Sequence, residues 1–154
     1  MSGPFERMHH VCIVVHDIEA SMAYYRGLGI GPWHELSGLR GLSDLSMPNP
    51  EAFYAMRYMY ADVENVQLQL CQPPMLDCPQ RHILDSRGEC VFHIGFATAD
   101  VDRGEQLARE LGLDVVMRGR REGGGGFSYF DTGPAGVTLM IRSVPPPTGR
   151  EGSS

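Results

Sequence analysis

No hydrophobic run in this sequence approaches the roughly 18 apolar residues that a membrane-spanning helix needs. The first ten residues, MSGPFERMHH, lack the basic-then-apolar pattern of a secretory signal. Basic residues are also in deficit, because 13 Lys and Arg stand against 19 Asp and Glu and give a formal net charge of −6. Without a basic stripe, binding to nucleic acid or to an anionic membrane through bulk charge is not expected. We therefore expect a cytoplasmic protein.

Cysteine is scarce, with four residues at Cys12, Cys71, Cys78 and Cys90 and no CxxC pair among them. Three of the four lie within apolar, strand-like runs. A zinc knuckle or a disulfide framework is therefore a poor interpretation. Small buried hydrophobic residues in a reducing compartment explain the cysteines better.

An internal repeat is the most informative feature of the chain. Shifted by 83 residues, segment 9–30 aligns without a gap with segment 92–113. Identical residues meet at the pairs His10/His93, Asp17/Asp100, Arg26/Arg109, Leu28/Leu111 and Gly29/Gly112. The chain therefore consists of two copies of one structural unit.

Each copy predicts a buried strand, then a helix, then three extended segments. In the first copy the apolar strand covers 11–15, Asp17 is an N-cap for the helix, and Gly29 ends it. The extended segments of this copy are expected at 33–40, 54–61 and 65–71.

The second copy predicts the same order, with its first strand at 91–97, an N-cap at Asp100 and extended segments at 115–118, 126–131 and 137–143. A short helix is expected near 80–84, between the copies. The predicted fold class is α+β, with two tandem βαβββ modules that form a curved eight-stranded mixed sheet around a cavity.

Glycine and proline are abundant without a period, at 19 and 11 of 154 residues, which fits many turns and short strands. This length suits one domain, and we expect it over residues 6–144. Module one would cover 6–73, a linker 74–89 and module two 90–144. The segment 145–154, PPPTGREGSS, has no apolar content and is expected to be a disordered tail.

The last strand of each copy has one apolar and one polar face. Residues 66–71 place Gln67 and Gln69 opposite an aliphatic face. Residues 137–142 do the same with Thr138, Met140 and Arg142. These polar faces can line the cavity.

The sequence resembles the vicinal-oxygen-chelate superfamily, also called the glyoxalase/bleomycin-resistance/dioxygenase superfamily, and is most similar to its methylmalonyl-CoA epimerase and glyoxalase branch. The resemblance covers about residues 7–143. It rests on MHHVCIVVHDIEASMAYYRGLGI, on WHEL at 33–36, on VQLQLCQP and on VFHIGFATADVD. It implies a homodimer, and a divalent metal ion bound by His10, Gln69 and His93, with Met140 at the position of a fourth, acidic ligand.

Two positions depart from the family pattern. Met140 supplies a neutral thioether in place of a carboxylate, so the metal is either compensated by an anionic substrate, or weakly held or absent. Arg57 stands where the alignment puts the second carboxylate of the epimerase-type enzymes. Two-base epimerisation and extradiol dioxygenase chemistry are therefore not expected.

Further candidates come from residues that could line the cavity. Arg57 would bind an anion if it points inward, although an exposed strand position is the common alternative. Glu35 is a candidate for a catalytic base, with a surface position as the alternative. Trp33, Tyr60, Thr138 and Met140 are expected to bind substrate, whereas His9, His16, His34 and His82 are expected to be exposed.

Three functions remain open. The first is a divalent-metal-assisted isomerase, epimerase or lyase acting on a small carbonyl, carboxylate or acyl substrate. The second is a metal-free small-molecule binder of the bleomycin-resistance kind, and the third is a metal-free cyclase or isomerase of secondary metabolism. The first is preferred because His10, Gln69 and His93 provide three of the four family ligands.

Overall fold

Two antiparallel strands at the centre of the sheet join the two halves of the chain. The computed structural model describes residues 3–36, 41–133 and 136–144, so the predicted tail at 145–154 lies outside the described residues. The described elements, in chain order, are β1 (Arg7–Val14), α1 (Ile18–Gly27), β2 (His34–Glu35), β3 (Leu42–Ser46), α2 (Pro50–Ala55), β4 (Arg57–Val63), β5 (Val66–Gln72), α3 (Pro79–Arg87), β6 (Cys90–Thr98), α4 (Val101–Glu110), β7 (Asp114–Arg121), β8 (Gly126–Asp131) and β9 (Thr138–Ser143).

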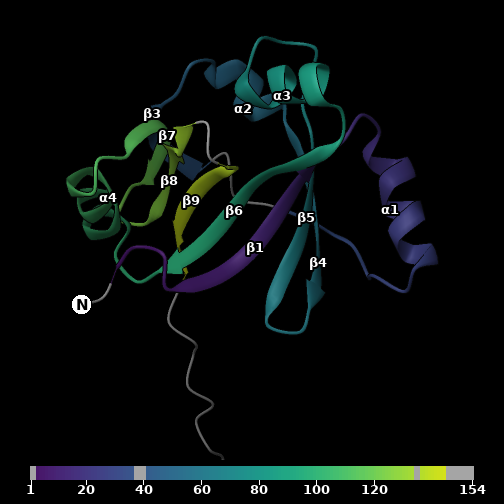
Figure 1. Cartoon of the computed structure of the whole chain (residues 1–154), viewed down its shortest axis with the longest axis horizontal. Helices are drawn as coiled ribbons and strands as arrows, with labels where there is room; N and C mark the ends of the chain where they lie inside the picture. The colour runs from purple at the N-terminus through teal and green to yellow at the C-terminus, as the bar shows by residue number, and fades with distance from the viewer. Residues whose placement is uncertain (1–2, 37–40, 134–135, 145–154) are drawn as a thin grey trace, which may run out of the picture.

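The sheet order is β2-β4-β5-β1-β6-β9-β8-β7-β3. The first strands of the two repeat copies, β1 and β6, pair antiparallel with each other. Each then pairs in parallel with the last strand of its own copy, β1 with β5 and β6 with β9. The sheet curves around one side of the molecule (Figure 1). The predicted α+β class with a curved mixed sheet is confirmed.

The sheet has nine described strands, where eight were expected. Only residues 34–35 of the strand predicted at 33–40 pair with β4, and 37–40 lie outside the described residues. The chain then forms β3, which pairs with β7 at the opposite edge of the sheet. Leu42 on β3 is buried with Phe53 and Phe127, and this hydrophobic contact explains the crossing to the second half.

Both long helices of the repeat begin where the sequence predicts. The carboxylate of Asp17 accepts hydrogen bonds from the backbone N–H of Glu19 and Ala20, each at 3.1 Å. Asp100 accepts one from Arg103 at 3.0 Å. The second helix of the chain, α2, was not predicted, although Asn49 caps it and Pro50 occupies its first turn.

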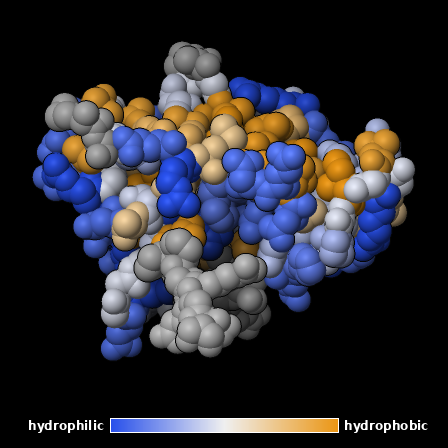
Figure 2. Space-filling model, turned by 90° about the horizontal axis from the view of Figure 1, so that it is seen from below, coloured by the Kyte–Doolittle hydropathy of each residue, from blue (hydrophilic) through white to orange (hydrophobic). Residues whose placement is uncertain are grey.

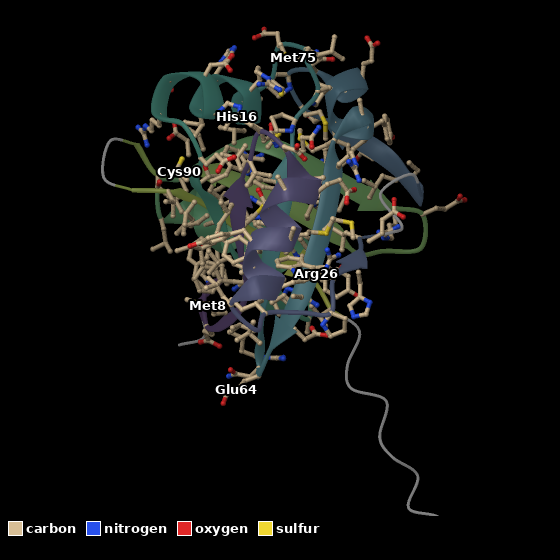
Figure 3. The ribbon with its side chains drawn as sticks, turned by 90° about the vertical axis from the view of Figure 1, so that its right-hand side faces the viewer. Met8, His16, Arg26, Glu64, Met75 and Cys90 are labelled. Carbon is tan, nitrogen blue, oxygen red and sulfur yellow. The ribbon has the colours of Figure 1, made fainter. Side chains whose placement is uncertain are left out.

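The helices cover the outer face of the sheet at its two wings. Ile18 and Met22 of α1 pack on Leu70 of β5, and Figure 3 shows α1, with Arg26 near its end, lying in front of the strands of this wing. Val101 and Ala108 of α4 are buried in one cluster with strands β8 and β9. None of the helices in the described ranges is long and apolar enough to span a membrane.

Helices α2 and α3 lie together at one end of the curved sheet (Figure 1). Phe53 of α2 and Leu84 of α3 share a buried cluster with Val14 and Met140 of the inner sheet face. This packing closes one end of the concave side and leaves the remainder of that side for a cavity.

A buried ionic cluster fixes α4 on the sheet. The carboxylate of Glu105 accepts hydrogen bonds from Arg120 Nη2 at 2.7 Å, Arg118 Nε at 3.1 Å and Ser128 Oγ at 2.6 Å. Burial acts to raise the pKa of Glu105, but the hydrogen bonds from Ser128 and Arg118 outweigh it and lower the pKa to about 2. The ionised carboxylate therefore stabilises the folded state.

We predict that Glu105→Gln lowers the free energy of unfolding by about 3 kcal/mol at pH 7, because it leaves two guanidinium groups without their shared carboxylate. The matched change Asp102→Asn removes an exposed partner of Arg120 and should cost about 1 kcal/mol or less. The pKa of Glu105 is lower in the folded chain, so its contribution is present above its ordinary value of 4.5 and is lost as pH falls towards 2. Urea unfolding should show the wild-type advantage shrinking in that window, and equal losses in both variants would contradict the prediction.

Candidate functional site

The concave side of the sheet holds a cavity of about 490 Å³. Both halves of the chain contribute to it, with His10 and Gln69 from the first half and Tyr129, Met140 and Arg142 from the second. Its other lining residues are Leu36, Phe53, Tyr58, Ala99, Arg121, Gly124, Gly125, Gly126, Phe127, Ser143 and Val144. Within the described part of the chain, the lining therefore contains aromatic walls, two arginines and no carboxylate.

The two repeat-related histidines meet beside this cavity. His10 Nε2 lies 2.8 Å from His93 Nε2, and the two rings are nearly perpendicular, with centroids 5.0 Å apart. Both residues are 1% exposed. The antiparallel register of β1 and β6 produces this contact, because it sets Cys12 opposite His93 and His10 opposite Gly95, with both imidazoles on the concave face.

Gly95 makes room for the His10 imidazole. A Cβ atom built on Gly95 would overlap that ring. The backbone at this position does not have a positive φ, so the glycine is needed for space and not for conformation. The absence of a side chain at Gly95 thus sets the position of His10.

His9 belongs to the site, although the sequence predicted it to be exposed. Its Nδ1 lies 2.8 Å from Nδ1 of His10, so His9, His10 and His93 form a continuous chain of ring nitrogens. A register shift between Met8 and His10 accompanies this departure from strict strand alternation. Burial, with Arg142 and Arg7 as further positive charges, lowers the pKa of His9 to about 4.

The two central imidazoles are neutral at physiological pH. Burial lowers the pKa of His93 to about 3. It also lowers the pKa of His10 far below its ordinary value, with the neighbouring His93, His9 and Arg142 acting in the same direction. Neutral imidazole nitrogens carry the lone pair that a metal ion or a proton donor requires. His93 Nδ1 is buried without a described hydrogen-bond partner.

Gln69 supplies the third polar group that the sequence predicted here. It is 2% exposed, and its Nε2 donates a hydrogen bond to Gln67 Oε1 at 3.2 Å. This leaves its own carbonyl oxygen without a described donor. Met140, at the expected place of the acidic ligand, is buried in the wall of the same cavity.

In donor type, His10, His93 and Gln69 could supply three neutral ligands to a metal ion. No group of three His, Cys, Asp or Glu side chains suited to a metal occurs in the described ranges, so the third donor would be the Gln69 amide. Three neutral ligands with an open position are sufficient in catalytic zinc sites of the three-histidine type. Imidazole favours zinc, iron or nickel over magnesium. The negative charge that is missing would have to come from a bound anion.

Three predicted site residues lie away from the cavity. Arg57 is on the face of β4 that meets α1, where its Nη2 is 2.8 Å from the Glu19 carboxylate, so it is a surface ion pair and not an anion anchor in the cavity. Trp33 is buried in the core beneath α1, with Tyr25 against its ring. Glu35 is exposed on the edge strand β2 and does not line the cavity, so it is not placed to act as a base there.

Two other predicted residues lie on the concave face without lining the cavity. Tyr60 follows Tyr58 on the same face of β4 and contacts the ring of His34. Thr138 is the register partner of His93 and precedes Met140 on the same face of β9. Among the charged residues of the cavity lining, Arg121 at the end of β7 was not predicted; the pairing of β7 in the sheet brings it to the cavity.

Fold and site together define a domain made of two similar βαβ-containing halves, with one histidine from each half beside a shared cavity. The chain belongs to the Glyoxalase/Bleomycin resistance protein/Dioxygenase superfamily, whose sequence profile matches residues 9–130. This confirms the family that the sequence motifs indicated. No curated protein sequence matches the chain significantly.

Solved structures with the same fold include methylmalonyl-CoA epimerases. The epimerase of Mycobacterium tuberculosis matches at 20% identity and a TM-score of 0.72, over 95% of this chain and 93% of that one. A Streptomyces coelicolor epimerase variant in complex with 2-nitronate-propionyl-CoA matches at 24% identity and a TM-score of 0.70, over 92% and 99%. An epimerase in complex with methylmalonyl-CoA and NH4+ matches equally well, at 24% and 0.70, over 92% and 96%. At these identities the likeness shows the shared fold.

We predict that Gly95→Ala displaces the His10 imidazole, because the added methyl group would occupy the space of that ring. The displacement should break the His10–His93 contact and cost about 1–3 kcal/mol of stability as local overpacking. Ring ¹⁵N NMR should show altered His10 and His93 signals. Gly27→Ala is the control, because a Cβ there meets nothing within 4 Å. Unchanged histidine signals in Gly95→Ala would contradict this placement of the ring.

Proposed function

We propose that the protein is a metal-assisted enzyme of the isomerase, epimerase or lyase type that acts on a small carbonyl, carboxylate or acyl compound. The single observation that carries this proposal is the convergence of His10 Nε2 and His93 Nε2 at 2.8 Å beside the cavity. Two buried, neutral imidazoles come from opposite halves of the chain, and one of them, His10, lines the cavity. Packing alone does not require such a pair.

His10, Gln69 and His93 would hold the metal ion in this proposal. A divalent ion bound there would polarise a substrate carbonyl oxygen and stabilise the negative charge of an enolate. The protein would contribute orientation and exclusion of water through the aromatic walls of Tyr58, Phe127 and Tyr129. His9 would fix the orientation of His10 through their Nδ1 contact.

The residues of the cavity lining limit the reactions that this site could catalyse. Met140 occupies the acidic ligand position, and Arg57, at the aligned place of the second carboxylate, pairs with Glu19 on the outside. The described lining thus offers no carboxylate pair for two-base epimerisation. The epimerases with the same fold bind CoA esters, which makes an acyl thioester one candidate substrate.

A metal-free small-molecule binder, or a metal-free cyclase or isomerase, is the second candidate. Met140 and the nearby Arg142 favour it, because a thioether is a poor ligand for hard divalent ions and a guanidinium group repels a cation. In this case His10 and His93 would act only as hydrogen-bonding groups towards the ligand.

Metal content separates the two candidates. We predict about one zinc, iron or nickel ion per chain in purified tag-free protein, and its loss in His10→Ala. His16→Ala is the matched control, since His16 is exposed and does not line the cavity. Met140→Glu should bind the metal more tightly, because it adds an anionic ligand beside the histidines. Protein that stays metal-free after incubation with these ions, in both wild type and Met140→Glu, would favour the metal-free candidate.

We further propose a homodimer formed through the outer face of β1 and β6, which lies between the wings covered by α1 and α4. This face carries the partly exposed apolar residues Val11, Ile13, Val91, Ile94 and Phe96. Met8 and Cys90 lie on this side of the molecule in Figure 3, and hydrophobic surface extends along the upper side of Figure 2. An uncharged apolar strip can pack against its own copy without repulsion.

Ile94→Glu is therefore predicted to convert a dimer into a monomer, because a two-fold contact would bring two buried carboxylates together. Light scattering after size-exclusion chromatography measures the mass, and circular dichroism checks that the variant is folded. Leu111→Glu is the control, because Leu111 is 71% exposed at the end of α4, away from this face. A folded Ile94→Glu protein that is still dimeric would rule out this interface, as would a monomeric wild type.

A further inference from the structure

We propose that the cavity contains a binding site for the anionic group of an organic ligand, a carboxylate or a phosphate, formed by Arg142 and Arg121. The inference deepens the proposed function, because it concerns the ligand of the same cavity. It does not need a bound metal, so the two proposals can fail separately.

The two arginines reach the cavity from different strands. Arg142 follows Met140 by two residues on β9, so both side chains are on the concave face, and both line the cavity together with His10. Arg121 ends β7 and lines the same cavity.

Neither guanidinium has a carboxylate partner among the described residues. Five other arginines of the chain do form salt bridges with Asp or Glu, namely Arg57, Arg81, Arg109, Arg118 and Arg120. Arg120 shows how a buried arginine is normally satisfied here, with Asp102, Glu105, Ser128 and Phe127 as acceptors. Arg142 is half-buried and has no comparable set of acceptors.

Leaving Arg142 half-buried and unpaired is unfavourable for the empty protein. Burial lowers the pKa of the Arg142 guanidinium, and the like charge of Arg121 lowers it further, while Tyr129 and Tyr60 act in the opposite direction. An anion placed between the two arginines would remove this penalty through charge-assisted hydrogen bonds. Arg142 therefore has the environment of a ligand-binding arginine.

The surroundings of the two arginines indicate the remainder of the ligand. Gly124, Gly125 and Gly126 line the same cavity without side chains, and the Gly126 N–H donates to Ser143 Oγ at 2.8 Å, which ties this turn to β9. The lining also contains the aromatic residues Phe53, Tyr58, Phe127 and Tyr129. A volume of about 490 Å³ suits a small organic molecule. The expected ligand thus has an anionic group at one end and a flat or apolar body.

The test uses metal-stripped protein in a chelating buffer and three probes that share a phenyl ring. Benzoate and phenyl phosphate carry the two candidate anions, and benzamide is the neutral counterpart of benzoate. Isothermal calorimetry, or NMR titration for weak binding, gives the affinities. We expect at least one anion to bind about tenfold or more tightly than benzamide, and the better anion identifies the ligand class.

Arg142→Met then tests the assignment to Arg142. It keeps an apolar stem of similar length, and it should weaken binding of the preferred anion by about tenfold or more. The empty variant should melt at a higher temperature than wild type, because an unpaired half-buried charge is removed. Arg121→Met should weaken anion binding to a smaller extent, since Arg121 is the more exposed of the two. Arg103→Met is the control on the exposed side of α4 and should change neither property.

Three results would overturn the site. They are equal binding of benzamide and both anions, an unchanged anion affinity in a folded Arg142→Met protein, and anion binding that needs added metal and is insensitive to Arg142→Met. The last result would leave the proposed metal site intact while removing the arginine site. Conversely, anion binding without any metal affinity would keep the arginine site and remove the metal proposal.

Discussion

The antiparallel pairing of β1 with β6 is the constraint on which the site depends. It joins the two repeat copies along their first strands and so brings residues 83 positions apart into hydrogen-bonding distance. The same pairing puts Gly95 beneath His10, and only the missing side chain lets the imidazole turn towards His93. A duplicated strand–helix unit therefore creates a pair of facing histidines by symmetry, without any local motif for a site.

Charged and polar groups on the outer face of the sheet have hydrogen-bond partners, whereas some on the concave face lack them among the described residues. On the outer face, Glu105 compensates Arg118 and Arg120, and each partner in that cluster has several hydrogen bonds. On the concave face, the described residues leave His93 Nδ1 without a partner and Arg142 without a carboxylate. Folding alone does not account for the second set, because a buried polar group without a partner is destabilising. Unsatisfied groups gathered around one cavity are typical of a binding site.

Much of the fold follows from local sequence, and the exceptions have a physical cause. The strands at β1 and β6 and the caps at Asp17 and Asp100 could be predicted because apolar patterning and N-cap chemistry are local. The path of β3 could not, since its pairing with β7 joins opposite edges of the sheet and depends on burial of Leu42. The helix at 50–55 had a local signal in Asn49 and Pro50 that the sequence prediction did not use.

The site residues also divide into those that the sequence predicts and those whose position depends on the folded sheet. The repeat pointed to His10, and the family resemblance pointed to Gln69 and Met140, which strand alternation puts on the polar face; all three line the cavity. Arg57 does not lie on the concave face, because strand alternation gives that face to Tyr58 and Tyr60. Arg57 is on the opposite face of β4, where it forms an ion pair with Glu19. Arg121 has no signal in its own segment, because its position depends on how β7 joins the sheet.

The charges in the cavity connect the two proposed properties of the site. A divalent ion held by His10, Gln69 and His93 would add positive charge to a wall that already contains two guanidinium groups. Such a site binds the metal ion more tightly when an anion is bound at the same time, so metal and anionic ligand should bind cooperatively. If no metal is present, the arginines alone still favour the anion. In both cases the absence of a carboxylate in the described lining makes an organic anion the ligand that completes the site.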